Sequence, residues 1–299
     1  TLGTKGSTQV VVPFLTESYG STRDPADESI PVCTLKNFPH KIEHTIQWAR
    51  DHFEGLFKAG PSEVNNYLTQ PDYLEELAKQ ANVQLQNLQT IKSYLVDDKP
   101  ADFAHCVKWA RLLFEDEYHY KIAQLLHNFP ADSLTSEGQP FWSGTKRQPE
   151  PLQFNSQDPT HMEFILSAAN LRAANYNIPQ SHDLDSIRSI LSTIVTKPFV
   201  PQQNAKIATT EAEAKEMLDK VEDDHEQKVN NIINALPKPS SLAGYHLQAI
   251  DFEKDDPTNF HIDFITACSN LRARNYAIKE ENKHQTKFIA GRIIPALAT

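Results

Sequence analysis

Apolar residues recur at spacings of three and four positions between residues 38 and 57, which places them on one face of a helix. They are Phe38, Ile42, Ile46, Ala49, Phe53, Leu56 and Phe57. Asn37 is a suitable N-cap residue, and Pro39 is tolerated in a first helical turn. The pair Gly60-Pro61 is a typical stop signal. The pattern therefore predicts an amphipathic helix over residues 38–57.

The same periodicity predicts further helices, joined by short turns, along most of the chain. They cover residues 62–68, 71–82, 84–96 and 101–128, a helical stretch over 159–195, and then 210–236, about 258–276 and about 284–296. Two β-rich stretches, Thr8–Phe14 and Tyr245–Phe252, predict minor strands, the first at a sheet edge because Pro13 cannot donate a ladder hydrogen bond. The predicted fold is mainly α, with helical lobes at about 38–130 and 158–240, a connector at 131–157 and minor β-strands near the chain ends.

An internal repeat appears at an offset of 100 residues. His161-Met162-Glu163-Phe164-Ile165 corresponds to His261-Ile262-Asp263-Phe264-Ile265, and Asn170-Leu171-Arg172-Ala173 corresponds to Asn270-Leu271-Arg272-Ala273. Asn175-Tyr176 likewise corresponds to Asn275-Tyr276. Each copy follows an Asp-Pro-Thr sequence, which is typical of a helix start. We favour a helix packed in the same way twice, with its Asn and Arg making local hydrogen bonds. The alternative is a pair of equivalent binding sites.

The composition narrows the functional classes. The chain has 299 residues, 39% hydrophobic and 23% charged, as in a soluble globular protein. Its formal net charge of −10 argues against a nucleic-acid surface and mildly favours basic partners. None of the Gly-rich phosphate-binding motifs is present, and no apolar run is long enough to predict a membrane span.

The three widely spaced cysteines do not make a disulfide framework and predict a reducing compartment, the cytoplasm or nucleus. Cys106 and Cys268 lie within helical patterns, and Cys268 occupies the position of Ala168 in the first repeat copy. We expect both thiols to be buried and structural. Cys33 differs, because it follows a proline in a predicted extended segment beside polar residues.

Cys33 is the candidate nucleophile. Lys36 and the start of the following helix both place positive potential near the thiol, and positive potential favours the reactive thiolate. Thr34 is a candidate hydrogen-bond donor, and Lys36 a candidate for stabilising a thiolate or an oxyanion. The local pattern alone leaves a functional thiol and an ordinary loop cysteine equally open. A Cys–His protease pair also remains open, because a histidine partner can lie anywhere in the sequence.

A second motif lies close by. His40-Lys41-Ile42-Glu43-His44 matches the H-x-x-E-H pattern of inverted zinc peptidases, with both histidines on one helix face. That face points away from the apolar stripe, so we expect the histidines to be solvated and no metal to be bound. A zinc peptidase using His40, Glu43 and His44 is therefore the weaker alternative.

The residues around Cys33 also resemble a known family. Pro31-Val32-Cys33-Thr34-Leu35-Lys36-Asn37-Phe38-Pro39 resembles the catalytic-cysteine motif of ubiquitin-activating enzymes, and the likeness continues through Trp48-Ala49-Arg50 and Phe53-Glu54-Gly55-Leu56-Phe57. It extends over nearly the whole chain, including Phe141-Trp142-Ser143-Gly144 and Ala290-Gly291-Arg292-Ile293-Ile294-Pro295-Ala296.

This resemblance implies the second catalytic cysteine half-domain of a larger enzyme. Residues 31–257 would form the half-domain, residues 1–30 would cross from an adenylation domain, and residues 258–299 would return toward it. Cys33 would attack the ubiquitin C-terminal adenylate, carry ubiquitin as a thioester and pass it to the cysteine of a ubiquitin-conjugating enzyme. Thr34 and Lys36 would support it, Lys36 standing where a basic residue is expected.

The resemblance also implies the cofactors and partners. This fragment would hold no cofactor, while ATP and Mg would bind the adenylation domain of the full-length enzyme. The expected partners are ubiquitin, ubiquitin-conjugating enzymes and that adenylation domain, with no nucleic acid and no membrane. Lys206–Glu211 lies where the family tends to carry a polar, acidic segment near the active site, although no catalytic role is assigned to Glu211. A non-catalytic helical interaction module, in which Cys33 is replaceable, remains the main alternative.

Overall fold

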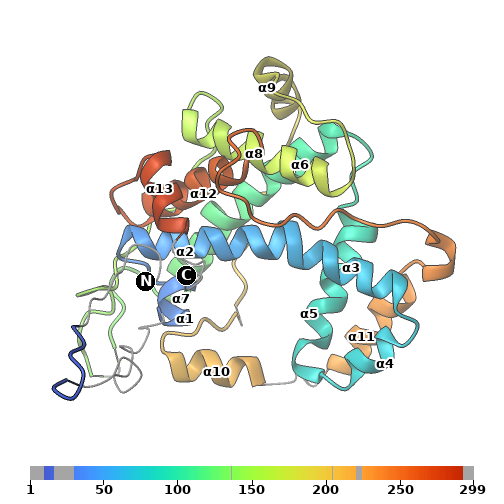
Figure 1. Cartoon of the computed structure of the whole chain (residues 1–299). Helices are drawn as coiled ribbons and strands as arrows, with labels where there is room; N and C mark the ends of the chain where they lie inside the picture. The colour runs from blue at the N-terminus through green and yellow to red at the C-terminus, as the bar shows by residue number, and fades with distance from the viewer. Residues whose placement is uncertain (1–9, 17–29, 136, 204, 220–223, 292–299) are drawn as a thin grey trace.

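Helices dominate the computed structural model, which describes residues 10–16, 30–135, 137–203, 205–219 and 224–291 (Figure 1). The helices near the N-terminus are α1 (Val32–Lys36), α2 (Ile42–Phe53), the π-helix η2 (Glu54–Ala59), α3 (Gly60–Thr69), α4 (Tyr73–Ala78), α5 (Ala81–Lys92) and the π-helix η3 (Ser93–Asp97). Then come α6 (Phe103–Glu115), the π-helix η4 (Asp116–Tyr120), α7 (Lys121–Asn128), α8 (Pro159–Asn175) and α9 (Leu184–Ser192). The last are α10 (Glu211–Asp219), α11 (His225–Ala235), the 3₁₀-helix η5 (Pro239–Leu242), α12 (His261–Asn275) and α13 (Lys283–Ala290). None of the described helices is both long and apolar enough to cross a membrane.

The mainly α prediction is confirmed, but the two minor strands are wrong as far as they are described. The described part of the first, from Val10 onward, forms a turn in which the N–H groups of Leu15 and Thr16 donate to Val12 O; Thr8 and Gln9 lie outside the described residues. Tyr245–Phe252 is extended but pairs with helix carbonyls: Gln248 N–H donates to Asn175 O and Ile250 N–H to Phe57 O. The segment lies along helices, with Tyr245 and Leu247 packed against the smaller apolar cluster and Ile250 and Phe252 against the larger one.

The predicted helix end at Gly60-Pro61 is also wrong, because α2, η2 and α3 form one continuous helix, visible as the long bar across Figure 1. The π-helix η2 changes the hydrogen-bond register, with Gly60 N–H donating to Gly55 O. Pro61 then falls at the start of α3, where a missing N–H is tolerated. The other long helix, Phe103–Asn128, matches the prediction for 101–128 and begins where the Asp102 side chain accepts from His105 N–H.

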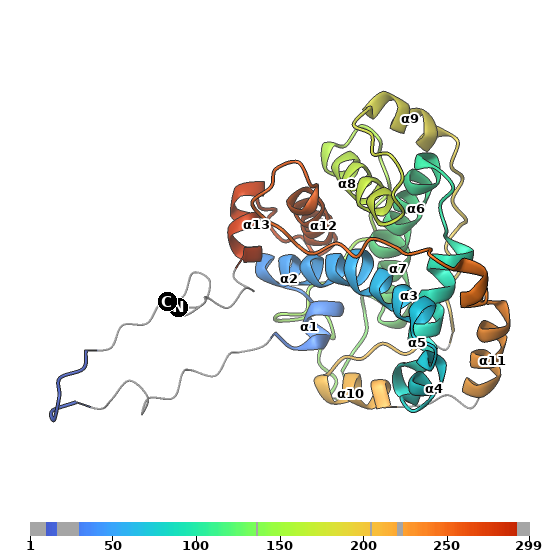
Figure 2. The same ribbon diagram turned by 45° about the vertical axis from the view of Figure 1, so that its right-hand side comes forward.

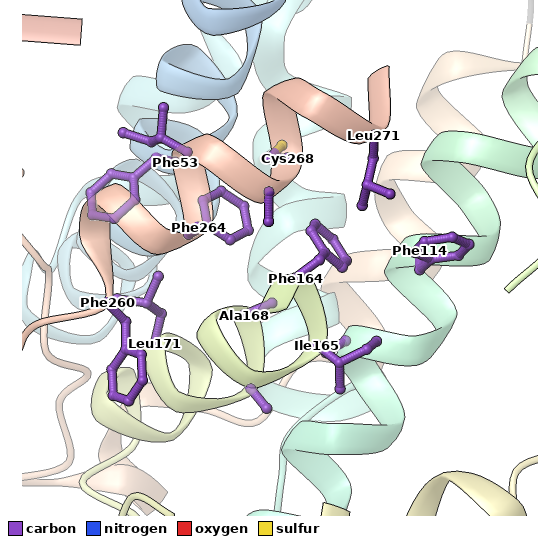
Figure 3. Packing of buried hydrophobic residues seen from close by; sticks show 14 of the residues in the cluster. Phe53, Phe114, Phe164, Ile165, Ala168, Leu171, Phe260, Phe264, Cys268 and Leu271 are labelled. Carbon is purple, nitrogen blue, oxygen red and sulfur yellow. The ribbon is translucent and has the colours of Figure 1, made fainter. Parts of the chain in front are cut away.

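Two large apolar clusters form most of the core of the described residues, and both combine segments from before and after the connector. The larger joins α2, α6, α8 and α12, with aromatic rings meeting where α2, α8 and α12 approach one another (Figure 3). The smaller joins α3, α4, α5 and α11, which lie together at one end of the long α2–α3 helix (Figure 2). In the connector, Phe141 stacks on Phe129 with ring centroids 4.3 Å apart, and Trp142 Nε1 donates to Phe129 O.

The larger cluster contains two units of the same design. One pairs α2 with α12 and the other pairs α6 with α8. The sequence Trp-Ala-Arg occurs in both first helices, as Trp48-Ala49-Arg50 and Trp109-Ala110-Arg111, a second repeat that sequence reasoning missed. Phe53 packs on His261 with centroids 4.9 Å apart, and Phe114 packs on His161 with centroids 4.8 Å apart.

Hydrogen bonds repeat in the same way and confirm the favoured interpretation of the 100-residue repeat. Asn170 exchanges side-chain hydrogen bonds with the backbone of Ser181, and Asn270 does so with Glu281. The two repeat arginines reach farther than the predicted local bonds. Both are buried, and each guanidinium lies over the tryptophan of its own unit: Arg172 is 4.7 Å from the Trp109 ring and Arg272 is 4.2 Å from the Trp48 ring.

Candidate functional site around Cys33

Cys33 lies in the short helix α1 and not in the predicted extended segment. Pro31 has a φ of −54°, which suits a helix start, and its carbonyl accepts from Leu35 N–H at 3.0 Å. The helix ends when Asn37 and Phe38 N–H both donate to Cys33 O. The long helix begins at Ile42, not at residue 38, so its first turn does not directly follow the thiol as predicted.

A carboxylate from the far side of the sequence reaches the thiol. Glu211, the first residue of α10, accepts a hydrogen bond from Val32 N–H at 3.0 Å through Oε2. The same oxygen lies 3.9 Å from Cys33 Sγ, within range of an S–H donor. The segment before α10 is fixed by Asn37 Nδ2, which donates to Ala208 O at 3.0 Å. Cys33 is half-buried, so the carboxylate contacts a thiol that is still partly accessible to solvent.

The opposite end of α1 is held by α12 and the residue that follows it. Arg272 Nη2 donates to Leu35 O at 3.1 Å and also to Lys36 O. The Tyr276 hydroxyl donates to Asn37 O at 2.7 Å. Lys36 and Asn37 also border a cavity of about 440 Å³, whose other lining residues include Trp48, His52, Glu117, Lys121, Arg272 and Tyr276.

Charged and ionisable side chains line that cavity. Burial lowers the pKa of His52, against the opposing effect of Glu117. Burial alone would raise the pKa of Glu117, but His52 and Lys121 hold it below its usual range. His52 Nε2 lies 3.3 Å from Glu117 Oε1, and Lys121 Nζ donates to the same carboxylate oxygen at 2.5 Å. The lining of the cavity therefore includes a Glu117–Lys121 ion pair beside His52.

The two other predicted site residues lie on α1. Thr34 is half-buried and Lys36 is exposed. Because Cys33 and Lys36 are three residues apart on a helix, their side chains share one face. Their assigned supporting roles stay predictions.

The neighbouring histidine pair is not solvated as expected. His44 is only 8% exposed and packs edge-to-face on His40, with ring centroids 4.4 Å apart. Burial, reinforced by the charges of His40 and Lys41, lowers the pKa of His44 to about 4. Within the described part of the chain there is no cluster of three or more His, Cys, Asp or Glu side chains that could hold a metal ion.

The other two thiols have the buried settings that the sequence predicts. Cys106 and Cys268 are both fully buried, and Cys268 and Ala168 lie in the same region of the core (Figure 3). Burial raises the pKa of Cys106 to about 12 and also raises that of Cys268. Both thiols are therefore protonated and shielded at neutral pH, which leaves Cys33 as the accessible one.

Comparison with known proteins identifies the family. The sequence profile of the family described as "Ubiquitin-activating enzyme, SCCH domain" matches residues 39–287. The chain belongs to this family. The part that matches the SCCH family begins at Pro39, just after the candidate nucleophile.

Relatives of this SCCH chain align over its whole length, Cys33 included. "Ubiquitin-like modifier-activating enzyme 1" of Dictyostelium discoideum is 53% identical over 303 residues. "Ubiquitin-activating enzyme E1 1" of Schizosaccharomyces pombe is 50% identical over 299 residues, and "Ubiquitin-like modifier-activating enzyme 1" of Homo sapiens is 48% identical over 300 residues. Each alignment covers 100% of this chain but only 30%, 29% and 28% of the respective relative, so the chain spans about three tenths of their length.

Sequence reasoning missed two parts of the site. The sequence marks Glu211 only as part of a polar segment, and its contact with Cys33 joins residues 178 positions apart. Arg272 and Tyr276 stand out in the sequence only as members of the repeat. The two Trp-Ala-Arg sequences were the available signal for Arg272 and Tyr276. They mark two similar helices, α2 and α6, and each of these packs on one helix of the 100-residue repeat.

Proposed function

We propose that this chain is the catalytic cysteine half-domain of a ubiquitin-activating enzyme, with Cys33 as the residue that carries ubiquitin. The observation that carries the proposal is the pairing of the accessible Cys33 thiol with the Glu211 carboxylate at 3.9 Å. Membership of the SCCH family and the names of the relatives support the choice of ubiquitin as the acyl group.

In the first step, Cys33 Sγ attacks the carbonyl carbon of the ubiquitin C-terminal adenylate. A carbon–sulfur bond forms, the bond from that carbon to the AMP phosphate oxygen breaks, and AMP leaves. The thiol proton passes to Glu211, which is placed as a general base. The hydrogen bond from Val32 N–H fixes the Glu211 carboxylate beside the Cys33 thiol, where the carboxylate can accept the thiol proton.

In the second step, the cysteine of a ubiquitin-conjugating enzyme attacks the thioester. The new thioester forms as the bond to Cys33 breaks, and Cys33 leaves as a thiolate that recovers a proton. Exchange between two thioesters changes little in bond energy, so access and positioning decide the rate. The half-exposed setting of Cys33 suits this exchange, and the net charge of −10 favours partners with basic docking surfaces.

Lys36 and Thr34 have supporting roles in this proposal. Lys36 shares the Cys33 face of α1, where a cation stabilises negative charge developing on the attacked carbonyl oxygen. Thr34 follows Cys33 directly and offers a hydroxyl donor. Thioester formation at the normal rate in Lys36→Ala would remove Lys36 from the site.

The adenylate would come from a separate adenylation domain of the full-length enzyme, which binds ATP and Mg. The flank 1–30 would lead out of that domain and 258–299 would lead back. The cysteine content favours action in the cytoplasm and nucleus.

The test is a chimera in which this chain replaces the aligned segment of the Dictyostelium relative. With ATP and ubiquitin, the chimera should form a ubiquitin adduct that reducing thiols remove, and Cys33→Ala should abolish it. Glu211→Gln keeps a hydrogen-bond acceptor but not the base, so we expect a loss of about 100-fold in the rate. Glu216→Gln, an exposed change on the same helix, is the matched control and should leave the rate unchanged.

The same chimera tests the interaction-module alternative. If Cys33→Ala leaves the adduct and its transfer intact, Cys33 is replaceable and the catalytic proposal is wrong. Equal rates for Glu211→Gln and Glu216→Gln would remove Glu211 as the base but leave Cys33 as the carrier.

A further inference from the structure

The five residues of α1 are too few to form a stable helix alone, because isolated helices shorter than about 12 to 15 residues are marginal in water. The orientation of Cys33 therefore depends on what holds the two ends of α1. Glu211 binds the first turn through Val32 N–H, and Arg272 binds the last turn through the carbonyls of Leu35 and Lys36.

The Arg272 guanidinium is buried, and its Nη2 atom makes the hydrogen bonds to α1. Arg272 is 3% exposed, its Cζ atom lies 4.2 Å from the centroid of the Trp48 ring, and the residue belongs to helix α12. A fixed cation at the C-terminal carbonyls of a helix also stabilises that helix electrostatically. Tyr276 lies one helical turn after Arg272 and provides a second donor, because its hydroxyl donates to Asn37 O.

The other unit supplies an internal comparison. Arg172 is 1% exposed, lies over Trp109 and donates to Asp98 O at the end of η3. Tyr176 donates to Tyr94 O at 2.8 Å. The same Arg and Tyr pair therefore fixes the end of the helix that precedes each Trp-Ala-Arg helix. In one unit that preceding element is an ordinary core helix, and in the other it carries Cys33.

We propose that Arg272, assisted by Tyr276, is a positioning residue for Cys33, which rests on the proposed role of Cys33 as the ubiquitin carrier. Arg272 does not touch the reacting sulfur. It fixes the carbonyl end of α1, so that the thiol meets the Glu211 carboxylate and faces the incoming acyl group. The two units therefore use the same Arg–Tyr pair differently. Arg172 and Tyr176 hold a core helix, whereas Arg272 and Tyr276 hold the helix that carries the nucleophile.

The experiment compares Arg272→Gln with Arg172→Gln in the chimera described above. Each variant removes a buried guanidinium from an equivalent stack, so both are expected to lower stability. Only Arg272→Gln should slow thioester formation at saturating ubiquitin, by at least about tenfold, with the KM for ubiquitin changed less than about twofold. Release of pyrophosphate on adenylate formation should be the same in both and serves as the control for the rest of the enzyme.

A milder pair guards against loss of folding. Tyr276→Phe removes only the hydroxyl that binds Asn37 O, and Tyr176→Phe removes only the hydroxyl that binds Tyr94 O. We expect Tyr276→Phe to slow thioester formation about threefold or more and Tyr176→Phe to leave it unchanged. Without ubiquitin, alkylation of Cys33 in the 299-residue chain should be faster in Tyr276→Phe, because a loosened α1 exposes the thiol.

The outcomes separate the two proposals. An adduct that persists in Cys33→Ala overturns the carrier role itself. A different result would overturn only the positioning role. In that case Cys33→Ala abolishes the adduct, but Arg272→Gln reacts as fast as Arg172→Gln and Tyr276→Phe reacts as fast as Tyr176→Phe.

Discussion

Replacing Gly60 with alanine should destabilise the protein, although alanine is the better helix former. Gly60 is buried within the continuous α2–α3 helix. A Cβ atom at this position would lie 2.7 Å from Tyr94 Oη and 2.8 Å from Tyr94 Cζ. The Tyr94 ring cannot easily withdraw, because it is 5% exposed, its hydroxyl donates to Leu56 O and it stacks on Tyr176.

Two opposing effects set the magnitude. Alanine gains about 1 kcal/mol over glycine in a helix interior. Forcing an extra carbon into a filled core costs about 1 to 3 kcal/mol. The difference between the two effects is a loss in the free energy of unfolding of about 1 kcal/mol for Gly60→Ala, and of no more than about 2 kcal/mol. Gly55 lies five residues earlier in the same helix, and a Cβ atom there would meet nothing within 4 Å, so Gly55→Ala should gain up to about 1 kcal/mol.

Urea unfolding of the two variants provides the assay. The midpoint should fall for Gly60→Ala and rise for Gly55→Ala, with unchanged slopes. Tyr94→Phe removes the nearest clashing atom, so the double variant Gly60→Ala/Tyr94→Phe should lose less stability than the sum of the single changes. A Gly60→Ala protein as stable as the unmodified chain would refute the steric argument.

Two further predictions concern thiols and acid. A thiol reagent near neutral pH should label Cys33 rapidly and label Cys106 and Cys268 only after unfolding, as peptide mass spectrometry would show; prompt labelling of all three would contradict their burial. Because burial lowers the pKa of His44 to about 4 from 6.5, the unfolded chain binds a proton that the folded chain excludes, and stability is lost as the pH falls from 6.5 toward 4. His44→Gln should remove up to about 3 kcal/mol of this acid sensitivity, measured by urea unfolding across that pH range, whereas the exposed His284→Gln should not change it.

The helical period predicts most elements from sequence, because each amphipathic stripe is a local property of the chain. The helix over Phe103–Asn128 and the buried settings of Cys106 and Cys268 follow from it. Segments of the chain that depend on a distant partner are misread. The pair Gly60-Pro61 looks like a stop until Tyr94 packs on the glycine, and Tyr245–Phe252 looks like a strand until helix carbonyls take its N–H groups.

The candidate site shows the same division. The local motif and its resemblance single out Cys33, but the contacts that orient it come from Glu211 and Arg272, far along the chain. His44 is misread for a related reason. Its helix face lies opposite the main apolar stripe, yet the preceding chain folds back and covers it with His40.

The central claim is that Cys33 itself bonds to the ubiquitin carboxyl carbon, and Cys33→Ser tests it most directly. In the chimera with ATP and ubiquitin, the unmodified site should give an adduct that reducing thiols cleave. The serine variant should give a slower adduct that resists thiols and is cleaved by alkali, because an oxygen ester replaces the thioester. A thiol-sensitive adduct in Cys33→Ser would place ubiquitin on another cysteine and contradict the account.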